Sequence, residues 1–248
     1  MGRTGPDWRR HVARIAVITD THANLPALEV ALRAIGDLGC ETIYHTGDAV
    51  GTGPYPQEVL DRLLHTPGMR FLMGNHDELC AFGIPEPRPD WMDDLFAANT
   101  VWTRAQVDPE LQDVMASWPY EIIETVAGHL VAFLHYPLDP RGCGFVDIVP
   151  EPDRGNLDEL FRGLQAEIIF YGHHHPAADH TGRARYINPG SLGCGPEAVA
   201  RFTVIDVDLK DGLTIQHYAV PYDRSALHAA LVQRDLPDHE FLRTAFFP

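Results

Sequence analysis

The sequence predicts an α/β fold in which two packed β-sheets are flanked by helices. Two observations support this prediction. The first third of the chain alternates buried-strand and amphipathic-helix patterns, which is typical of a mainly parallel sheet with right-handed crossovers. The last third consists mostly of strand patterns. With 248 residues, an apolar content of 45 % and no recognisable linker, the chain is expected to form a single domain over residues 1–248.

The first third contains a β-α-β-α-β pattern. A buried strand is predicted over residues 14–19, because residues 15–18 form a continuous apolar run. A helix is predicted from about residue 24, because its apolar residues recur at helical spacing and glycines mark its end. A strand at 41–45, a helix at 56–65 and a strand at 69–73 follow. This order predicts neighbouring parallel strands.

The middle of the chain has a different pattern. Three prolines between residues 84 and 89 predict a loop, because each removes a backbone donor and fixes φ. Helical patterns follow at about 91–104 and 109–118. We therefore predict a helical cap insert over about residues 82–118, covering the C-terminal ends of the first strands.

The last part is richer in strands. A hairpin is predicted over residues 120–134, with its turn at Ala127 and Gly128. The remaining predicted elements are a helix at 156–164, a strand at 167–171, strands at 201–208 and 213–220 joined by a Lys-Asp-Gly turn, and a helix at 225–233.

Composition excludes several classes of protein. The formal net charge of −16 argues against general binding of nucleic acid or of an anionic membrane. No apolar run approaches the ~18 residues of a membrane helix, and the polar N-terminal lead-in, residues 1–11, lacks the apolar region of a secretory signal. The four cysteines are widely separated, which favours reduced thiols and a cytoplasmic location.

Polar side chains with metal-binding groups follow five predicted strands. They are Asp20 and His22 after the first strand, Asp48 after the second, Asn75, His76 and Asp77 after the third, His135 after the hairpin, and His173 and His175 after the strand at 167–171. In open α/β sheets, ligands gather at the carboxyl ends of strands. Taken alone, the motifs at Asp20 and Asp48 have an ordinary explanation as a helix cap or a turn, and a single strand-end histidine such as His135 is uninformative. The motifs at residues 75–77 and 173–175 are more specific. The repeated position of all five motifs predicts one shared site.

The types of donor in this site indicate which metals it would bind. Carboxylate, imidazole and carboxamide groups suit Mn, Fe, Ni, Co or Zn, with Mn favoured. Seven candidate ligands exceed one tetrahedral site, whereas two divalent ions that share a bridging carboxylate use them naturally. Two aspartates leave two divalent ions with a net positive charge. The site can therefore attract a small phosphate ester although the whole chain is acidic.

The motifs, in this order, resemble those of the calcineurin-like metallophosphoesterase superfamily. The stretches 20–28, 47–54 and 188–191 resemble in particular its small prokaryotic phosphodiesterase branch. The similarity extends from about residue 14 to residue 220. It implies an αββα sandwich of two mixed β-sheets flanked by helices, and a binuclear metal-dependent phosphoesterase.

The resemblance also implies a role for each site residue. The implied assignments are Asp20, His22 and His175 for one metal, Asn75, His135 and His173 for the other, and Asp48 as the bridge between them. A metal-bound hydroxide would attack phosphorus. His76 would assist the leaving group as a general acid or charge stabiliser, and Asp77 would fix its orientation.

One residue departs from the pattern of the family. Its members usually carry glycine directly after the strand-end histidine, where this chain has Tyr136. We hypothesise that the phenol ring binds near the substrate, narrows the entrance and limits substrate size.

Three functions remain open at this point. A phosphodiesterase acting on a small phosphate ester is favoured. A phosphomonoesterase or protein phosphatase would need more cationic groups to hold a dianion, and no arginine adjoins the Asn75 and His76 motif. A non-catalytic metal-binding scaffold, as found among some relatives, is less favoured because the catalytic position is retained. A nuclease is disfavoured by the acidity, and a homo-oligomer is left open.

Overall fold

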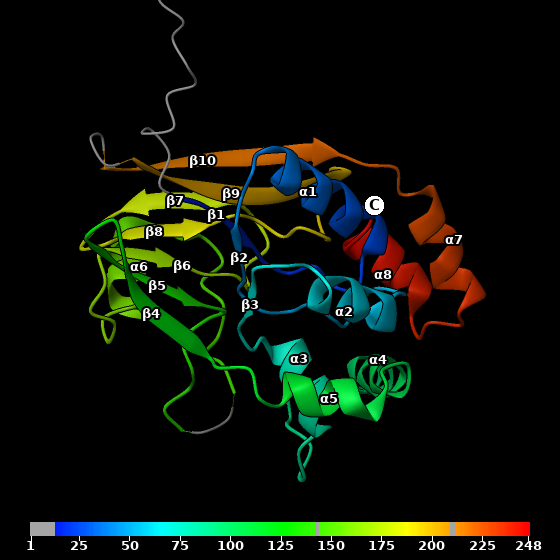
Figure 1. The fold of residues 1–248 in the computed structure, drawn as a ribbon. Helices are drawn as coiled ribbons and strands as arrows, with labels where there is room; N and C mark the ends of the chain where they lie inside the picture. The colour runs from blue at the N-terminus through cyan, green and yellow to red at the C-terminus, as the bar shows by residue number, and fades with distance from the viewer. Residues whose placement is uncertain (1–12, 142–143, 209–211) are drawn as a thin grey trace, which may run out of the picture.

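The computed structural model describes residues 13–141, 144–208 and 212–248. The expected N-terminal lead-in, Cys143, and the turn residues Lys210 and Asp211 lie outside the described residues. The predicted fold class is confirmed, because two mixed five-stranded sheets pack together with helices on their outer faces (Figure 1).

The first sheet contains the parallel strands predicted from the start of the chain. Its strand order is β10-β9-β1-β2-β3. The strands are β1 (Ala13–Ile18), β2 (Thr42–His45), β3 (Met69–Phe71), β9 (Val199–Asp208) and β10 (Gly212–Pro221). The pairs β1–β2 and β2–β3 are parallel, whereas β9 pairs antiparallel with both β1 and β10. The carboxyl ends of the three parallel strands therefore share one edge.

The second sheet has the order β4-β5-β6-β8-β7. Its strands are β4 (Glu121–Val126), β5 (His129–Leu134), β6 (Ile168–Phe170), β7 (Ala178–Thr181) and β8 (Arg185–Asn188). The β4–β5 hairpin is antiparallel, as predicted, while β5 and β6 pair in parallel. The ends of β5 and β6 thus lie side by side.

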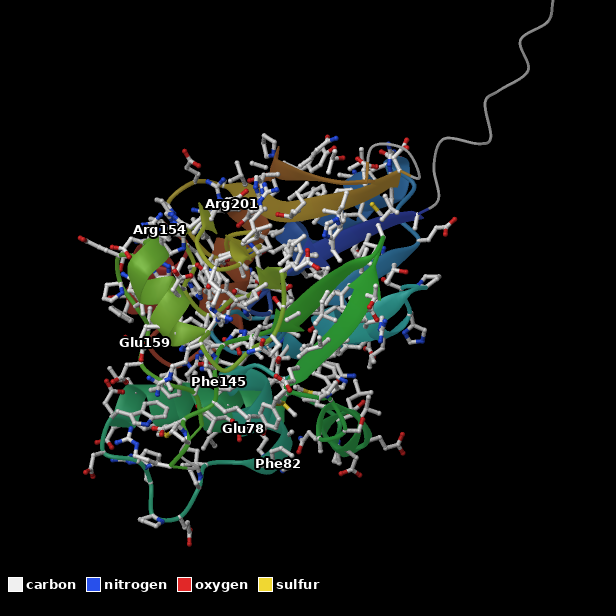
Figure 2. The ribbon with its side chains drawn as sticks, turned by 90° about the vertical axis from the view of Figure 1, so that its left-hand side faces the viewer. Glu78, Phe82, Phe145, Arg154, Glu159 and Arg201 are labelled. Carbon is white, nitrogen blue, oxygen red and sulfur yellow. The ribbon has the colours of Figure 1, made fainter. Side chains whose placement is uncertain are left out.

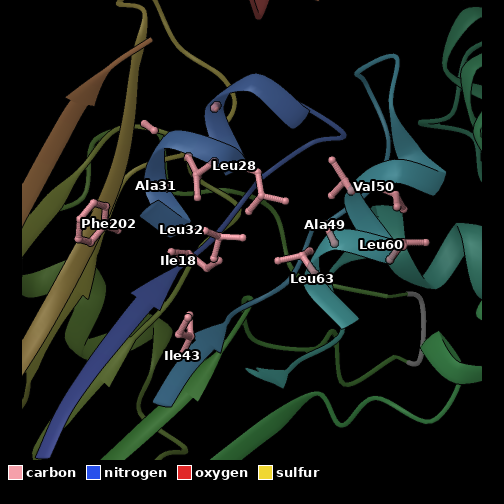
Figure 3. Packing of buried hydrophobic residues seen from close by; sticks show 14 of the residues in the cluster. Ile18, Leu28, Ala31, Leu32, Ile43, Ala49, Val50, Leu60, Leu63 and Phe202 are labelled. Carbon is pink, nitrogen blue, oxygen red and sulfur yellow. The ribbon is translucent and has the colours of Figure 1, made fainter. Parts of the chain in front are cut away.

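The alternation of side chains along β1 divides the core into layers. Ile15 and Val17 face the second sheet, where they join a buried cluster with Phe133. Ala16 and Ile18 face the opposite way, into a cluster with helices α1 (Leu25–Asp37) and α2 (Pro56–Leu64) that Figure 3 shows. Helix α6 (Arg154–Leu160) covers the outer face of the second sheet. These layers give the αββα order.

The remaining helices lie at the edges of this sandwich. They are α3 (Asn75–Phe82), α4 (Asp94–Ala105), α5 (Pro109–Met115), α7 (Ser225–Gln233) and α8 (His239–Ala245). Helix α3 packs against α4 and α5, so the predicted helical insert forms a group at one end of the molecule (Figure 1). In the part of the chain that the structure describes, no helix is long and apolar enough to cross a membrane.

Candidate metal centre

Strand ends from both sheets bring the candidate residues together. Asp20 follows β1, Asp48 follows β2, and Asn75 begins α3 just after β3. His135 directly follows β5, and His173 follows β6 in the other sheet. Because each set of strands is parallel, its carboxyl ends meet at one edge. The two edges face each other, so that six of the seven predicted ligands form two adjoining groups and the seventh, Asp48, lies between them.

The first group consists of Asp20, His22 and His175. The Nε2 atoms of His22 and His175 lie 2.9 Å apart. Asp20 Oδ1 lies 3.7 Å from each of these two nitrogens. Three donor atoms therefore converge on one point.

The second group consists of Asn75, His135 and His173. His135 Nε2 lies 3.1 Å from Asn75 Oδ1 and 3.2 Å from His173 Nδ1. The other ring nitrogen of His135, Nδ1, lies 2.9 Å from the carbonyl oxygen of Thr46. A carbonyl oxygen only accepts, so Nδ1 donates, and in the neutral ring Nε2 presents its lone pair to the group.

Asp48 lies between the two groups. Its Oδ2 is 3.3 Å from His135 Nε2 and 3.8 Å from His22 Nε2. Its Oδ1 accepts a hydrogen bond of 2.9 Å from the backbone N–H of His76. One carboxylate oxygen thus faces donors of both groups, which is the position required of a bridging ligand.

Four of the candidate ligands have strained backbones. Asp20, His22, Asp48 and His173 have φ values of 51°, 48°, 58° and 66°. Residues other than glycine rarely adopt this left-handed conformation, and such strain clusters at functional sites. In this chain the strain falls in the loops that follow β1, β2 and β6, where these four ligands lie.

The ionisation of the centre reflects charges buried close together. Burial alone would raise the pKa of Asp20, but a hydrogen bond with His22 and the nearby histidines hold it below its usual range. Burial would lower the pKa of His135, but the Asp48 carboxylate raises it to about 9. Burial lowers the pKa of His173 to about 3 and that of His175 to about 4. Without metal, the centre therefore combines anionic carboxylates, a protonated His135 and the neutral imidazoles of His173 and His175.

This donor set fits divalent cations. Asp48, His135 and His173 offer ligand atoms within 4.8 Å of one another, and so do His22, Asp48 and His76. The His22 Nδ1 atom is buried and has no hydrogen-bond partner among the described residues. Buried carboxylates, and imidazole nitrogens that face one another, are costly without a compensating charge. Two divalent ions would supply this charge.

Asp77 holds the backbone around Asp48. Its carboxylate accepts four backbone hydrogen bonds, at 2.7 Å from Asp48, 2.9 Å from Ala49, 3.2 Å from Val50 and 3.1 Å from Gly74. We expected Asp77 to orient the His76 ring. Its carboxylate instead accepts hydrogen bonds from the loop that carries Asp48, so Asp77 positions that loop. Burial and the Asp48 charge raise the pKa of Asp77 to about 7, while the backbone hydrogen bonds oppose this rise.

His76 lies at the open side of the centre. Its ring packs edge-on against the His22 ring, with a centroid distance of 5.1 Å. Gly51 (φ 80°) lies so close that an added Cβ would stand 2.3 Å from His76 Nδ1. Burial lowers the pKa of His76 to about 4, so the ring is neutral at pH 7. We expected His76 to act either as a general acid or as a charge stabiliser. A neutral ring fits the second role better, because it can donate a hydrogen bond but carries no proton that titrates near neutrality.

Tyr136 lies beneath the centre instead of at an entrance. Its side chain is buried, with 2 % exposure, in a cluster with Phe161 and Tyr171. Its hydroxyl accepts a hydrogen bond of 3.0 Å from the backbone N–H of Val149. The ring is 5.1 Å from the His173 ring. This packing supports His173 and leaves the phenol no face for the substrate contact that we hypothesised.

Cys194 was not predicted as a site residue. Its sulfur lies within 4.8 Å of ligand atoms of both His22 and His175. The loop that carries it is tied to the centre, because Ser191 Oγ and the Gly193 N–H both donate to the carbonyl oxygen of Asp20. Burial raises the pKa of this thiol well above its usual value. In the sequence, Cys194 is an isolated cysteine after a turn, and no local pattern marks it as a site residue.

Gly172 is required by the tight approach of the two sheets. A Cβ at this position would stand 2.0 Å from Thr19 Oγ1 and 2.8 Å from Asp20 Oδ2. We expect Gly172→Ala to lower the free energy of unfolding by about 1–3 kcal/mol through this overpacking. Urea unfolding of the metal-free protein measures the effect. Gly163→Ala, where a Cβ meets nothing within 4 Å, is the control, and equal stability of the two variants would contradict the steric argument.

Comparison with known proteins agrees with this geometry. Residues 14–212 match the family described as "Calcineurin-like phosphoesterase superfamily domain". The chain is 29 % identical to the uncharacterized protein MJ0912 of Methanocaldococcus jannaschii over 242 residues, covering 90 % of this chain and 94 % of that protein.

Two solved structures share the fold over nearly their full length. One is the hypothetical protein PH1004 of Pyrococcus horikoshii, with a TM-score of 0.78 and 21 % identity, covering 95 % of this chain and 99 % of that chain. The other is a metallophosphoesterase of Sphaerobacter thermophilus, with a TM-score of 0.73 and 22 % identity, covering 94 % and 97 %. The matched family segment includes every predicted site residue.

Proposed function

We propose that this chain, which belongs to the calcineurin-like phosphoesterase superfamily, hydrolyses small phosphodiesters at a centre of two divalent metal ions. The position of Asp48 carries the proposal. One of its carboxylate oxygens faces imidazole nitrogens of both groups, at 3.3 Å and 3.8 Å. A site for a single ion would not need a shared carboxylate between two sets of donors.

Each group would hold one ion. The proposed ligands are Asp20, His22 and His175 for the first, Asn75, His135 and His173 for the second, and Asp48 for both. When bound, the two ions would polarise the phosphoryl oxygens and activate a water molecule at neutral pH. The protein holds the donors in place through buried anchors, such as the Thr46 carbonyl behind His135. We propose manganese because the donors are carboxylate, imidazole and carboxamide groups.

His76 would act on the substrate directly. The residue is partly exposed, in contrast to the buried Asp48 and His135. Its backbone N–H donates a hydrogen bond to Asp48, which fixes the His76 backbone at the edge of the centre. From there a neutral imidazole can donate a hydrogen bond to the ester oxygen on which negative charge develops.

The charges around the centre favour a diester over a monoester. A monoester is a dianion at neutral pH, and its binding usually requires added cationic side chains. The strongest charge and hydrogen-bond influences on the pKa values of Asp20 and Asp48 come from histidines, and the Asp48 charge also acts on Asp20; no arginine is among them. The resemblance of residues 20–28 and 47–54 to small prokaryotic phosphodiesterases supports the same choice.

The test compares a diester and a monoester that release the same leaving group, p-nitrophenol. We expect the Mn²⁺-loaded protein to hydrolyse bis-p-nitrophenyl phosphate with a kcat/KM at least about tenfold above that for p-nitrophenyl phosphate, a difference of about 1.4 kcal/mol in transition-state stabilisation. Faster hydrolysis of the monoester would contradict the proposal in favour of a phosphatase. Binding of metal without hydrolysis of either ester would favour a scaffold.

We also propose a cytoplasmic location. The three described cysteines, Cys40, Cys80 and Cys194, are free thiols, as expected in a reducing compartment.

A further inference from the structure

The members of the centre differ in their exposure to solvent. Asp20, His22, Asp48 and His135 have exposures of 0 or 1 %. The partly exposed members of the site are Asn75, His76, His173 and His175. These four residues are the members of the centre that a substrate can meet first.

A phenylalanine ring packs against each of the three partly exposed histidines. The centroid of Phe96 lies 5.2 Å from that of His76. Phe145 lies 6.0 Å from His173 and also 5.4 Å from His135.

Phe246 makes the corresponding contact with His175, with its centroid 6.0 Å from that of the His175 ring. All three phenylalanines are half-buried, so each keeps part of its ring accessible. We call these three residues, Phe96, Phe145 and Phe246, the phenylalanine collar.

The collar is assembled from three distant segments. Phe96 is on α4 of the insert, Phe145 is in the loop after β5, and Phe246 directly follows α8 at the C-terminal end. Phe145 packs beside Tyr120, whose hydroxyl donates to Glu78 of α3. Figure 2 labels Phe145 and Glu78 on the face turned toward the viewer.

The C-terminal segment is fixed where it meets the site. The backbone N–H of Gly195 donates to the carbonyl oxygen of Phe246 at 2.9 Å. The next residue, Phe247, is fully buried in a cluster with Leu227 and Leu231 of α7. Phe246 is thereby held against His175, so the residue that follows α8 lies beside the site.

Further aromatic surface continues outward from the collar. Trp91 packs edge-on against Phe96 at 5.4 Å and is 62 % exposed. Phe241 packs against Phe246 at 6.2 Å and is 55 % exposed. Large exposed aromatic side chains that adjoin a site indicate a binding surface. Two exposed rings therefore extend the collar, Trp91 beyond Phe96 and Phe241 beyond Phe246.

We propose that the phenylalanine collar binds a flat aromatic ester group of the substrate, so that the preferred substrates are small aryl or nucleoside phosphodiesters. This inference rests on the proposed function, because it assigns the substituent of the same phosphate. Aromatic rings bind one another by offset stacking and by edge-to-face contact, which aliphatic groups cannot reproduce. The net charge of −16 disfavours a long polyanionic strand and leaves a small diester as the ligand.

The test separates binding from hydrolysis. Titration calorimetry of the Mn²⁺-loaded protein compares diphenyl phosphate with dimethyl phosphate, which have the same charged group. We expect diphenyl phosphate to bind at least about tenfold more tightly. Phe96→Leu, Phe145→Leu and Phe246→Leu should each weaken its binding by roughly two- to tenfold and leave dimethyl phosphate within about twofold, because leucine keeps the apolar bulk and removes the ring.

Phe82→Leu is the matched control. Phe82 is 59 % exposed at the C-terminal end of α3, and Figure 2 labels it apart from Phe145. This variant should bind both diesters as the unmodified protein does. Equal affinity for the two diesters, or equal effects of all four leucine variants, would overturn the proposal that the collar binds an aromatic ester group. Hydrolysis of diesters without aryl selectivity would overturn the collar alone, whereas aryl-selective binding without hydrolysis would overturn the proposed function alone.

Discussion

The Asp48→Asn variant is expected to bind fewer than two divalent ions per chain and to hydrolyse bis-p-nitrophenyl phosphate at least about 10²-fold more slowly. Residues that only support a metal ligand typically contribute 10- to 100-fold to affinity or activity, so a shared ligand should contribute at least as much. Asp48 Oδ2 faces both groups, and an amide removes its charge. Both proposed ions should be weakened together.

Metal content after dialysis against Mn²⁺ and the rate of p-nitrophenol release measure this effect. Asp223→Asn is the control, because its exposed carboxylate accepts hydrogen bonds only from Ser225 among the contacts recorded for the described residues. Retention of two ions with turnover within about twofold of the unmodified protein would show that Asp48 is not a shared ligand.

The Asp77→Asn variant is expected to lose about 2–6 kcal/mol of unfolding free energy even without metal. The Asp77 carboxylate accepts four backbone N–H groups, two on each oxygen. An asparagine can accept at only one of these positions, and its NH₂ group would face two buried donors. Either orientation of the amide leaves two buried N–H groups unpaired, each at a cost of about 1–3 kcal/mol.

Urea unfolding of the metal-free protein measures this loss, which keeps metal binding out of the comparison. Asp153→Asn is the matched control, because Asp153 caps helix α6 by accepting one N–H from Asn156, and asparagine caps helices equally well. A loss for Asp77→Asn no larger than that of the control would contradict the anchoring role.

The parallel strands and their ligands could be predicted from sequence because both depend on local pattern. The apolar runs at β1 and β5 identify buried strands, and polar side chains directly after such runs must lie at the sheet edge. Strands β7 and β8 were missed, since β7 alternates partly buried and exposed small or polar residues that resemble a loop. Helix α3 was missed because its first residues were interpreted only as ligands.

Features that depend on contacts between distant segments could not be predicted. The anchoring of the Asp48 loop by Asp77 appears only when β2 and α3 are adjacent. The collar requires Phe96, Phe145 and Phe246 to meet from three segments, and nothing in their local sequence distinguishes them from core phenylalanines. Tyr136 was expected at an entrance because the sequence shows only that it follows His135. The sequence does not show that α6 packs over the Tyr136 ring.

The most direct test of the account is hydrolysis of bis-p-nitrophenyl phosphate by the Mn²⁺-loaded protein beside its His76→Ala variant, with the exposed His65→Ala as control. We predict turnover that requires Mn²⁺, remains unchanged in His65→Ala, and falls by about 10²- to 10⁴-fold in His76→Ala while both ions stay bound. Turnover that is independent of Mn²⁺ or of His76, or its absence from the folded, metal-loaded protein, would contradict the proposal of a binuclear phosphodiesterase.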